Sequence, residues 1–164
     1  MALSRDAYKM LESIVGQENI SEEPAILDGY GYHFMIELVR KGTGTRFLPF
    51  RPGAVILPGS ADDVQAIIKV CNRFKLKSKA FSTGWGPWNG YDTEDTIIID
   101  LRRLNRILEI DEKNMYAVVD PYVSHAQLQA ETFKLGLHAF MPGVGCHTSV
   151  VANYAACMGI GGLS

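Results

Sequence analysis

A loop with three glycines and two tryptophans, set between two strand-like segments, constrains this sequence more than any other stretch. It runs from Phe81 to Tyr91 and reads FSTGWGPWNGY. Glycine permits positive φ angles and lets a ligand approach the backbone closely, and successive N–H groups in such a turn form a concavity that favours anions, phosphate above all. Ser82, Thr83 and Asn89 add side-chain donors, and the tryptophans can cover a flat ring. The alternative is a long hairpin loop whose tryptophans fill the edge of a core, and the loop alone does not separate the two.

The composition excludes several classes of protein. Sixteen Lys and Arg against 18 Asp and Glu give a net charge of −2, whereas nucleic-acid binders carry a basic patch. No apolar run approaches the roughly 18 residues of a membrane span, and the N-terminus lacks the pattern of a signal peptide. The three cysteines, Cys71, Cys146 and Cys157, imply no disulfide framework. We therefore expect a cytoplasmic protein with no nucleic-acid partner and no membrane span.

The first 51 residues predict one helix followed by an irregular arm. Ser4 can cap a helix over residues 4–15 that Gly16 closes. Its apolar residues recur on one face: Ala7, Leu11, Ile14 and Val15. Prolines and glycines interrupt residues 21–52 and leave one possible helical turn over 33–39. Such an arm usually wraps over a domain and carries little chemistry.

From Gly53 onward the pattern changes to alternating strands and helices. Residues 54–57 predict a short buried strand, and Ser60 with Asp63 has the spacing of a capping box at the start of a helix. The predicted strands 76–82 and 96–100 flank the glycine loop. The apolar face of the helix consists of Val64, Ile67, Ile68, Cys71 and Phe74, with Cys71 as core filler. This order predicts a layered α/β or α+β fold.

The second half of the chain predicts a hairpin, a helix and another glycine-rich loop. After a tight turn over 101–105, strands over 107–110 and 116–119 flank a turn sequence. Ser124 and Gln127 form a second capping box, and Gly136 ends that helix. The helix's expected apolar anchors are Leu128, Phe133 and Leu135. The glycine-rich loop 140–149 then leads into a small-residue helix over 150–158.

Few other residues suggest chemistry. The four histidines are scattered, and Cys146–His147 is the single adjacent Cys/His pair, so we expect no metal site. Asp62 and Asp63 suit the first turn of a helix as capping residues. The remaining candidates have simpler interpretations. Arg102 and Arg103 are expected to lie in a solvated turn, and Tyr91 and Tyr154 are expected to line a pocket. No catalytic residue can be assigned.

Residues 52–164 together resemble the first part of the FAD-binding domain of the vanillyl-alcohol oxidase and para-cresol methylhydroxylase family. Four stretches carry the resemblance in the family's order: 55–64, 82–90, 99–107 and 142–159. They match, in turn, the strand with its acidic helix start, the pyrophosphate loop, a strand ending in Asp100, and the loop and small-residue helix that line the flavin.

The resemblance implies an α+β fold that holds FAD between two subdomains. It implies a small βαβ-like subdomain and the start of a second one. It divides the chain into an N-terminal helix and arm (1–51) and an FAD-binding domain (52–164) that is incomplete at its C-terminus. The implied cofactor-binding residues are Ser82, Thr83, Gly84, Trp85, Gly86, Pro87, Trp88, Asn89, Gly90, Pro142, Gly143 and Ser149.

The sequence also departs from the family pattern. Pro87 stands where some branches carry a histidine that bonds covalently to the flavin, so we expect no covalent attachment through this loop. Pro121–Tyr122–Val123 replaces a common proline-glycine-valine. Val151–Ala152 replaces paired glycines and adds bulk near the expected flavin.

The expected function is the FAD-binding portion of an oxidoreductase that acts on an alcohol, hydroxy acid or phenol-type small molecule, with FAD as the hydride acceptor. Two alternatives stay open. One is a non-catalytic interaction module that kept the scaffold. The other is one half of a split flavoenzyme that a second chain completes. Unpaired strands in an incomplete domain would also favour a homo-oligomer.

Overall fold

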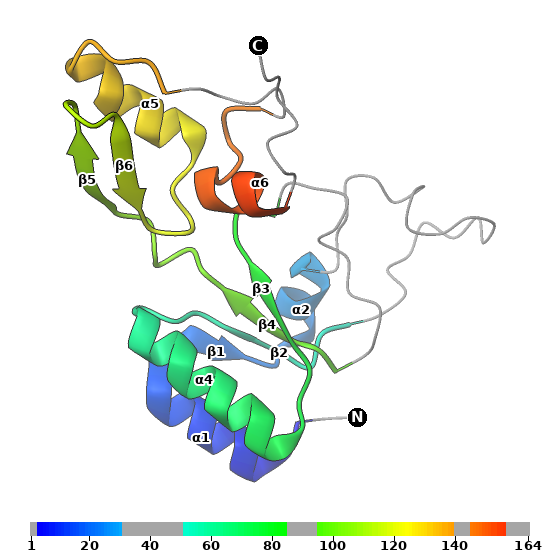
Figure 1. The fold of residues 1–164 in the computed structure, drawn as a ribbon. Helices are drawn as coiled ribbons and strands as arrows, with labels where there is room; N and C mark the ends of the chain where they lie inside the picture. Colours follow the sequence, from blue (N-terminus) through cyan, green and yellow to red (C-terminus); the bar gives the residue numbers. More distant parts are fainter. Residues whose placement is uncertain (1–2, 31–50, 85–94, 140–144, 157–164) are drawn as a thin grey trace, which may run out of the picture. The chain divides into compact units, whose positions relative to one another are not determined.

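The computed structural model describes residues 3–30, 51–84, 95–139 and 145–156, and the statements below concern these ranges. They form two compact units, the first built from residues 1–81 and 86–100 and the second from 82–85 and 101–164. The first unit contains α1 (Arg5–Val15), η1 (Gln17–Asn19), β1 (Ile20–Ser21), α2 (Pro24–Tyr30), β2 (Ala54–Ile56), α4 (Ala61–Phe74), β3 (Ser78–Phe81) and β4 (Ile97–Asp100). The second contains β5 (Ile107–Asp111), β6 (Tyr116–Val119), α5 (His125–Lys134) and α6 (Val150–Ala156) (Figure 1).

The first unit is organised around a four-stranded sheet in the order β1-β2-β4-β3. Strand β1 is antiparallel to β2, whereas β2 and β3 both run parallel to β4. All four residues of β4 are buried, as expected for a central parallel strand covered on both faces. The predicted order of strand, helix, strand, loop and strand is confirmed.

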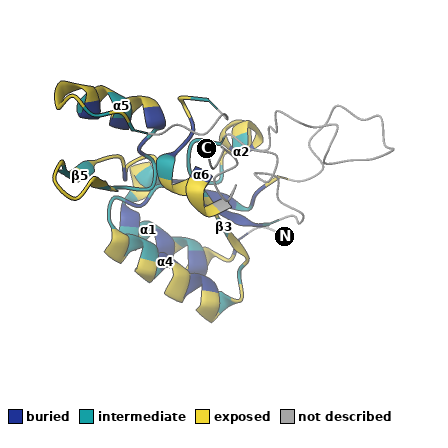
Figure 2. Ribbon diagram, turned by 45° about the horizontal axis from the view of Figure 1, so that its top comes forward, coloured by how far each residue is buried: buried dark blue, intermediate teal, exposed yellow. Residues whose placement is uncertain are grey.

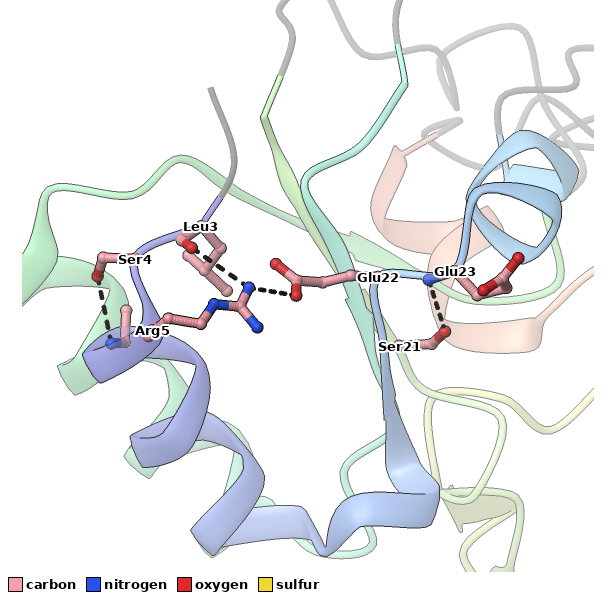
Figure 3. Close-up of polar contacts among 7 residues, drawn as sticks. Leu3, Ser4, Arg5, Ser21, Glu22 and Glu23 are labelled. Atoms are coloured by element: carbon pink, nitrogen blue, oxygen red, sulfur yellow. Dashed lines mark hydrogen bonds and ion pairs between the residues drawn. The ribbon is translucent and has the colours of Figure 1, made fainter.

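Helices α1 and α4 pack against each other along one face of the sheet (Figure 1). The Ser4 hydroxyl caps α1 by accepting a hydrogen bond from the Ala7 N–H at 3.3 Å, and Gly16 ends the helix at φ 86°. An ion pair between Arg5 and Glu22 ties the start of α1 to the segment after β1 (Figure 3). In the same view, the Ser21 hydroxyl accepts a bond from the Glu23 N–H at 3.0 Å.

Helix α4 confirms the predicted cap and corrects its predicted apolar face. The Ser60 hydroxyl accepts from the Asp63 N–H at 3.1 Å, and the Asp63 carboxylate accepts from the Gly59 N–H at 2.8 Å. Ile68, expected on the buried face, is 37% exposed, whereas Val70 is 5% exposed. At 100° per residue, Ile68 lies outside the arc on which Ile67, Val70 and Cys71 point inward. Cys71 is core filler as predicted, and its burial raises the pKa of its thiol.

The N-terminal arm is more ordered than its sequence predicts. Strand β1 pairs with β2, and helix α2 was not predicted at all. Leu27 of α2 is buried against Val55 and Ile98, so α2 covers the sheet face opposite α1 and α4, because side chains alternate along a strand. The periodicity is weak because only one side chain of this short helix is buried. The predicted turn at 33–39 lies outside the described residues.

The second unit contains the predicted hairpin and helix. Strands β5 and β6 are antiparallel with an irregularity between Ile107 and Glu109. Both halves of the capping box at Ser124 and Gln127 are present at the start of α5.

The prediction of three apolar anchors for α5 is wrong for two of them. Leu128 is buried, whereas Phe133 is 61% and Leu135 40% exposed. Phe133 lies five positions after Leu128, about 140° further around the helix, and Leu135 is already the C-terminal cap residue. His125 and Thr132 are buried on this helix instead, and Figure 2 shows its alternating buried and exposed surfaces. The α+β fold class is confirmed, and the domain boundary at residue 52 stays a prediction.

Candidate functional site

The predicted phosphate loop begins directly after β3, with Ser82, Thr83 and Gly84. Gly84 has a φ of 73°, a left-handed conformation that favours glycine because it lacks a Cβ. The other predicted loop residues, Trp85, Gly86, Pro87, Trp88, Asn89 and Gly90, lie outside the described residues, as does Tyr91.

The pairing of the flanking strands tests whether this loop is a hairpin connection. Strands β3 and β4 run parallel, with Phe81 opposite Asp100, so the connection between them is not a hairpin loop. The hairpin alternative is therefore wrong. The loop leaves the carboxyl end of a parallel strand, which is the edge where open α/β sheets bind their ligands.

A hydrogen-bond network within the second unit joins the start of this loop to the start of α6. The backbone N–H of Ser149 donates to the Thr83 hydroxyl at 3.1 Å. The Ser82 and Ser149 hydroxyls both donate to the Pro121 carbonyl, at 2.8 Å and 2.7 Å. The structure thus brings together Ser82, Thr83 and Ser149, although 66 positions separate Thr83 from Ser149.

Ser149 also organises the helix that follows it. Its hydroxyl accepts from the Ala152 N–H at 3.1 Å, and its carbonyl accepts from the Asn153 N–H at 3.0 Å. Val151 and Ala152, which replace the expected paired glycines, lie exposed on α6. Pro142 and Gly143 of the second glycine-rich loop lie outside the described residues.

The structure contains a buried pair, His125 and Asn153, that the sequence did not predict. The Asn153 amide nitrogen lies 3.3 Å from His125 Nε2, while His125 Nδ1 and Asn153 Oδ1 have no hydrogen-bond partner in the described part of the chain. Burial lowers the pKa of His125 because it penalises the charged imidazolium. No local pattern distinguishes this histidine from the three others.

The first turn of α5 is closed by the segment before α6. The N–H groups of His125 and Ala126 donate to the carbonyls of Thr148 and Cys146, at 3.0 Å and 2.8 Å. Free N–H groups at a helix start need such partners. These backbone hydrogen bonds hold the start of α5 to the segment that leads into α6. Ser149 follows Thr148 in that segment, so its position depends on the same bonds.

The remaining described candidates lie in a turn and beside a cavity. Arg102 and Arg103 lie exposed in a turn that the Leu104 N–H closes on the Leu101 carbonyl at 2.8 Å. Tyr154 lines a cavity of about 200 Å³ within the second unit. Among the described residues, no three His, Cys, Asp or Glu side chains gather into a group that could hold a metal ion. No helix in the same ranges combines the length and apolar character that a membrane crossing requires.

A family model described as an FAD binding domain matches residues 52–163. The chain belongs to this FAD-binding-domain family. FAD is accordingly the cofactor of the domain, and the flavin function is favoured over a cofactor-free module.

Individual relatives agree with this membership. The chain is 33% identical over 116 residues to 1'-carboxy-chondrochloren decarboxylase of Chondromyces crocatus, covering 68% of this chain and 21% of the relative. It is 32% identical over 80 residues to the flavoprotein subunit of 4-cresol dehydrogenase (hydroxylating) of Pseudomonas putida, covering 47% of this chain and 15% of the relative. The chain therefore spans about a fifth or less of these curated relatives.

A solved structure extends the agreement to the fold. The 4-ethylphenol oxidase of Gulosibacter chungangensis superposes with a TM-score of 0.75 at 28% identity, covering 92% of this chain and 29% of the oxidase. The similarity therefore includes the N-terminal residues that precede the family match at residue 52.

The described residues of the FAD-binding domain fit the pyrophosphate of such a cofactor. In the hydrogen bond between Ser149 and Thr83, the Thr83 hydroxyl oxygen is the acceptor. That bond therefore does not involve the hydrogen of the Thr83 hydroxyl. Gly84 turns the backbone at positive φ immediately afterwards. Successive backbone N–H groups in a turn that includes a left-handed residue form a concavity that binds anions.

Proposed function

We propose that this chain is the flavin-holding part of an oxidoreductase that oxidises an alcohol, hydroxy acid or phenol-type small molecule. The observation that carries the proposal is the hydrogen bond from Ser149 to Thr83, because it joins the described ends of the two glycine-rich stretches. The names of two relatives, a 4-cresol dehydrogenase and a 4-ethylphenol oxidase, support a phenol-type substrate.

The residues of this chain would bind and orient the cofactor. When bound, FAD supplies the acceptor for the hydride that leaves the substrate. We propose that Thr83 and Gly84 contact its pyrophosphate, that Ser82 fixes the start of the loop through Pro121, and that Ser149 holds the Thr83 side chain in place. The proposed site continues through residues 85–90 and includes Pro142 and Gly143.

Retention of FAD by the purified chain tests this function. Absorption spectra are recorded before and after addition of FAD and desalting, and the dissociation constant is measured by titration. We expect flavin bands that the unaltered chain retains. A colourless chain that FAD does not reconstitute would contradict the proposal.

A pair of glycine variants tests the loop itself. Gly84 and Gly136 have nearly the same φ, 73° and 72°, so alanine at either position costs about 1–2 kcal/mol of backbone strain. A Cβ on Gly136 would meet nothing within 4 Å. We expect Gly84→Ala to weaken FAD binding at least about tenfold and Gly136→Ala to leave it unchanged, since only Gly84 is proposed to approach the phosphates. Equal effects would argue against the loop as the cofactor site.

We further propose a cytoplasmic location and association with a second copy or a completing chain. Free thiols at Cys71 and Cys146 support the location, because reducing compartments keep cysteines unpaired. The exposed apolar side chains of Leu108, Met115 and Val118 on the hairpin support association. A monodisperse monomer in light scattering would contradict the association.

A further inference from the structure

The carboxylate of Asp100 is fully buried at the carboxyl end of β4. Its Oδ2 accepts a hydrogen bond from the Tyr30 hydroxyl at 2.6 Å. A buried carboxylate is costly unless hydrogen bonds compensate for its lost hydration. The donor comes from the last residue of α2, 70 positions earlier in the chain.

The ring of Tyr30 contacts the neighbouring strand end as well. It packs edge-on against Phe81, with ring centroids 5.2 Å apart and an interplanar angle of 67°. Phe81 ends β3 and lies opposite Asp100 in the parallel register. Tyr30 therefore holds the final residues of both strands, one through its hydroxyl and the other through its ring.

Apolar contacts fix helix α2 to the sheet at a place from which Tyr30 reaches the ends of both strands. Leu27, one turn earlier, is buried against Val55 of β2 and Ile98 of β4, and Tyr30 and Phe81 pack on the same cluster. Figure 1 shows α2 beside these strands. The helix is thus fixed to the sheet by apolar contacts, and its last residue lies at the sheet's carboxyl edge.

We infer that Tyr30 is a positioning residue for residues 82–84, the described start of the proposed FAD-binding loop (called the cofactor loop below). The inference rests on the proposed function of that loop. Ser82 follows Phe81 directly, so the position of Phe81 sets the point at which the loop leaves the sheet. Tyr30 belongs to the segment before residue 52, where the family match begins. The N-terminal arm, expected to carry little chemistry, therefore supplies a residue on which the cofactor loop depends.

The first test compares two tyrosine variants that each remove one hydroxyl. Tyr30→Phe keeps the ring and removes the donor to Asp100. Tyr116→Phe is the matched control, because its hydroxyl also donates to a carboxylate, that of Glu109 at 2.8 Å, but on the exposed hairpin. We expect Tyr30→Phe to weaken FAD binding about tenfold, which is the lower end of the stabilisation given by a hydrogen bond to a charged group, and Tyr116→Phe to leave it unchanged.

A second comparison separates positioning from general destabilisation. Leu11→Ala empties a fully buried site on α1 and should lower the denaturant midpoint more than Tyr30→Phe does. If Tyr30 only stabilised the fold, Leu11→Ala would weaken FAD binding more than Tyr30→Phe. We expect the opposite order under conditions where both variants are folded.

A double-mutant cycle with Asp100→Asn isolates the hydroxyl–carboxylate contact. In Asp100→Asn the Tyr30 hydroxyl would donate to an amide oxygen, which is a weaker acceptor than a carboxylate oxygen, so Tyr30→Phe should weaken FAD binding less in this background than in the native one. Equal losses in the two backgrounds would show that the contact plays no part and would overturn the inference.

Hydrogen exchange of the chain without FAD provides a readout that needs no cofactor. We expect faster exchange at the amides of residues 81–84 in Tyr30→Phe and no change there in Tyr116→Phe. Unchanged exchange together with native FAD affinity in Tyr30→Phe would overturn this inference alone. Failure of the unaltered chain to bind FAD would overturn the proposed function, and this inference with it.

Discussion

Gly53 and Asp95 lie so close together that a Cβ on Gly53 would stand 3.1 Å from both the Cα atom and the carbonyl oxygen of Asp95. The Gly53 N–H donates to the Thr96 carbonyl at 3.0 Å, and Asp95 itself has a φ of 64°. The backbone segments that lead into β2 and β4 therefore lie in direct contact, and a side chain at position 53 would require one of them to shift.

Gly53→Ala should consequently destabilise the first unit. The neighbouring atoms are backbone and cannot rotate away, so we expect a loss of about 1–3 kcal/mol in the free energy of unfolding, as for overpacked cores. Gly29→Ala is the control, because a Cβ there would meet nothing within 4 Å; in helix α2 it should stabilise by up to about 1 kcal/mol. Urea unfolding measures both, and a neutral Gly53→Ala would contradict the close contact.

The hydroxyls of Ser82 and Ser149 share one acceptor, the Pro121 carbonyl. Each single alanine variant leaves that carbonyl one hydrogen bond. Ser82→Ala should cost about 1 kcal/mol, and Ser149→Ala should cost more, because it also removes the acceptor of the Ala152 N–H. The double variant removes both, so its loss should exceed the sum of the single losses. A double-mutant cycle in urea tests this, and simple additivity would argue that the two hydroxyls act independently.

Because His125 is buried, we expect the free energy of unfolding to fall in acid. Its folded-state pKa is lowered by burial, so the unfolded chain binds the proton more readily. Its contribution is therefore fully present above the ordinary histidine pKa near 6.5 and is lost as the pH falls below that value toward the folded-state pKa. Urea unfolding at pH 7.5 and pH 5 measures this dependence.

His125→Gln should flatten part of the pH dependence, whereas His138→Gln, at an exposed histidine, should retain it. Both variants retain carboxylates such as Asp120, whose pKa is lowered by Arg106. Comparing the two variants therefore cancels the contribution of these carboxylates to the pH dependence. Equal pH dependence in both variants would count against a role for the buried imidazole.

The two described cysteines should differ in reactivity. Cys146 is exposed, whereas Cys71 is buried and its raised thiol pKa lowers the thiolate fraction. We expect Cys146 to be alkylated at least about tenfold faster than Cys71 in the native protein, and at a similar rate in urea. Peptide mass spectrometry measures both sites, and rapid native labelling of Cys71 would contradict its burial.

Local signals in the sequence predicted much of the secondary structure correctly. The caps at Ser4, Ser60 and Ser124 are all present, because a cap depends on residues three or four positions apart. The hairpin and the central strands were also predicted correctly. Errors arose at Ile68, Phe133 and Leu135, where being apolar did not mean being buried. Which arc of a helix faces the core depends on the partner that packs there.

By itself, then, the sequence determined where the capped helices α1, α4 and α5, the hairpin and the glycine loop begin, because those features depend on near neighbours and backbone conformation; it did not predict β1 or α2. Only the tertiary structure decided the parallel pairing of β3 with β4, the contact of Tyr30 with Asp100 and the bond from Ser149 to Thr83. The two side-chain contacts join residues 66 or more positions apart. Nothing in the local pattern encodes them, because they form only when packing of the apolar faces brings distant segments together.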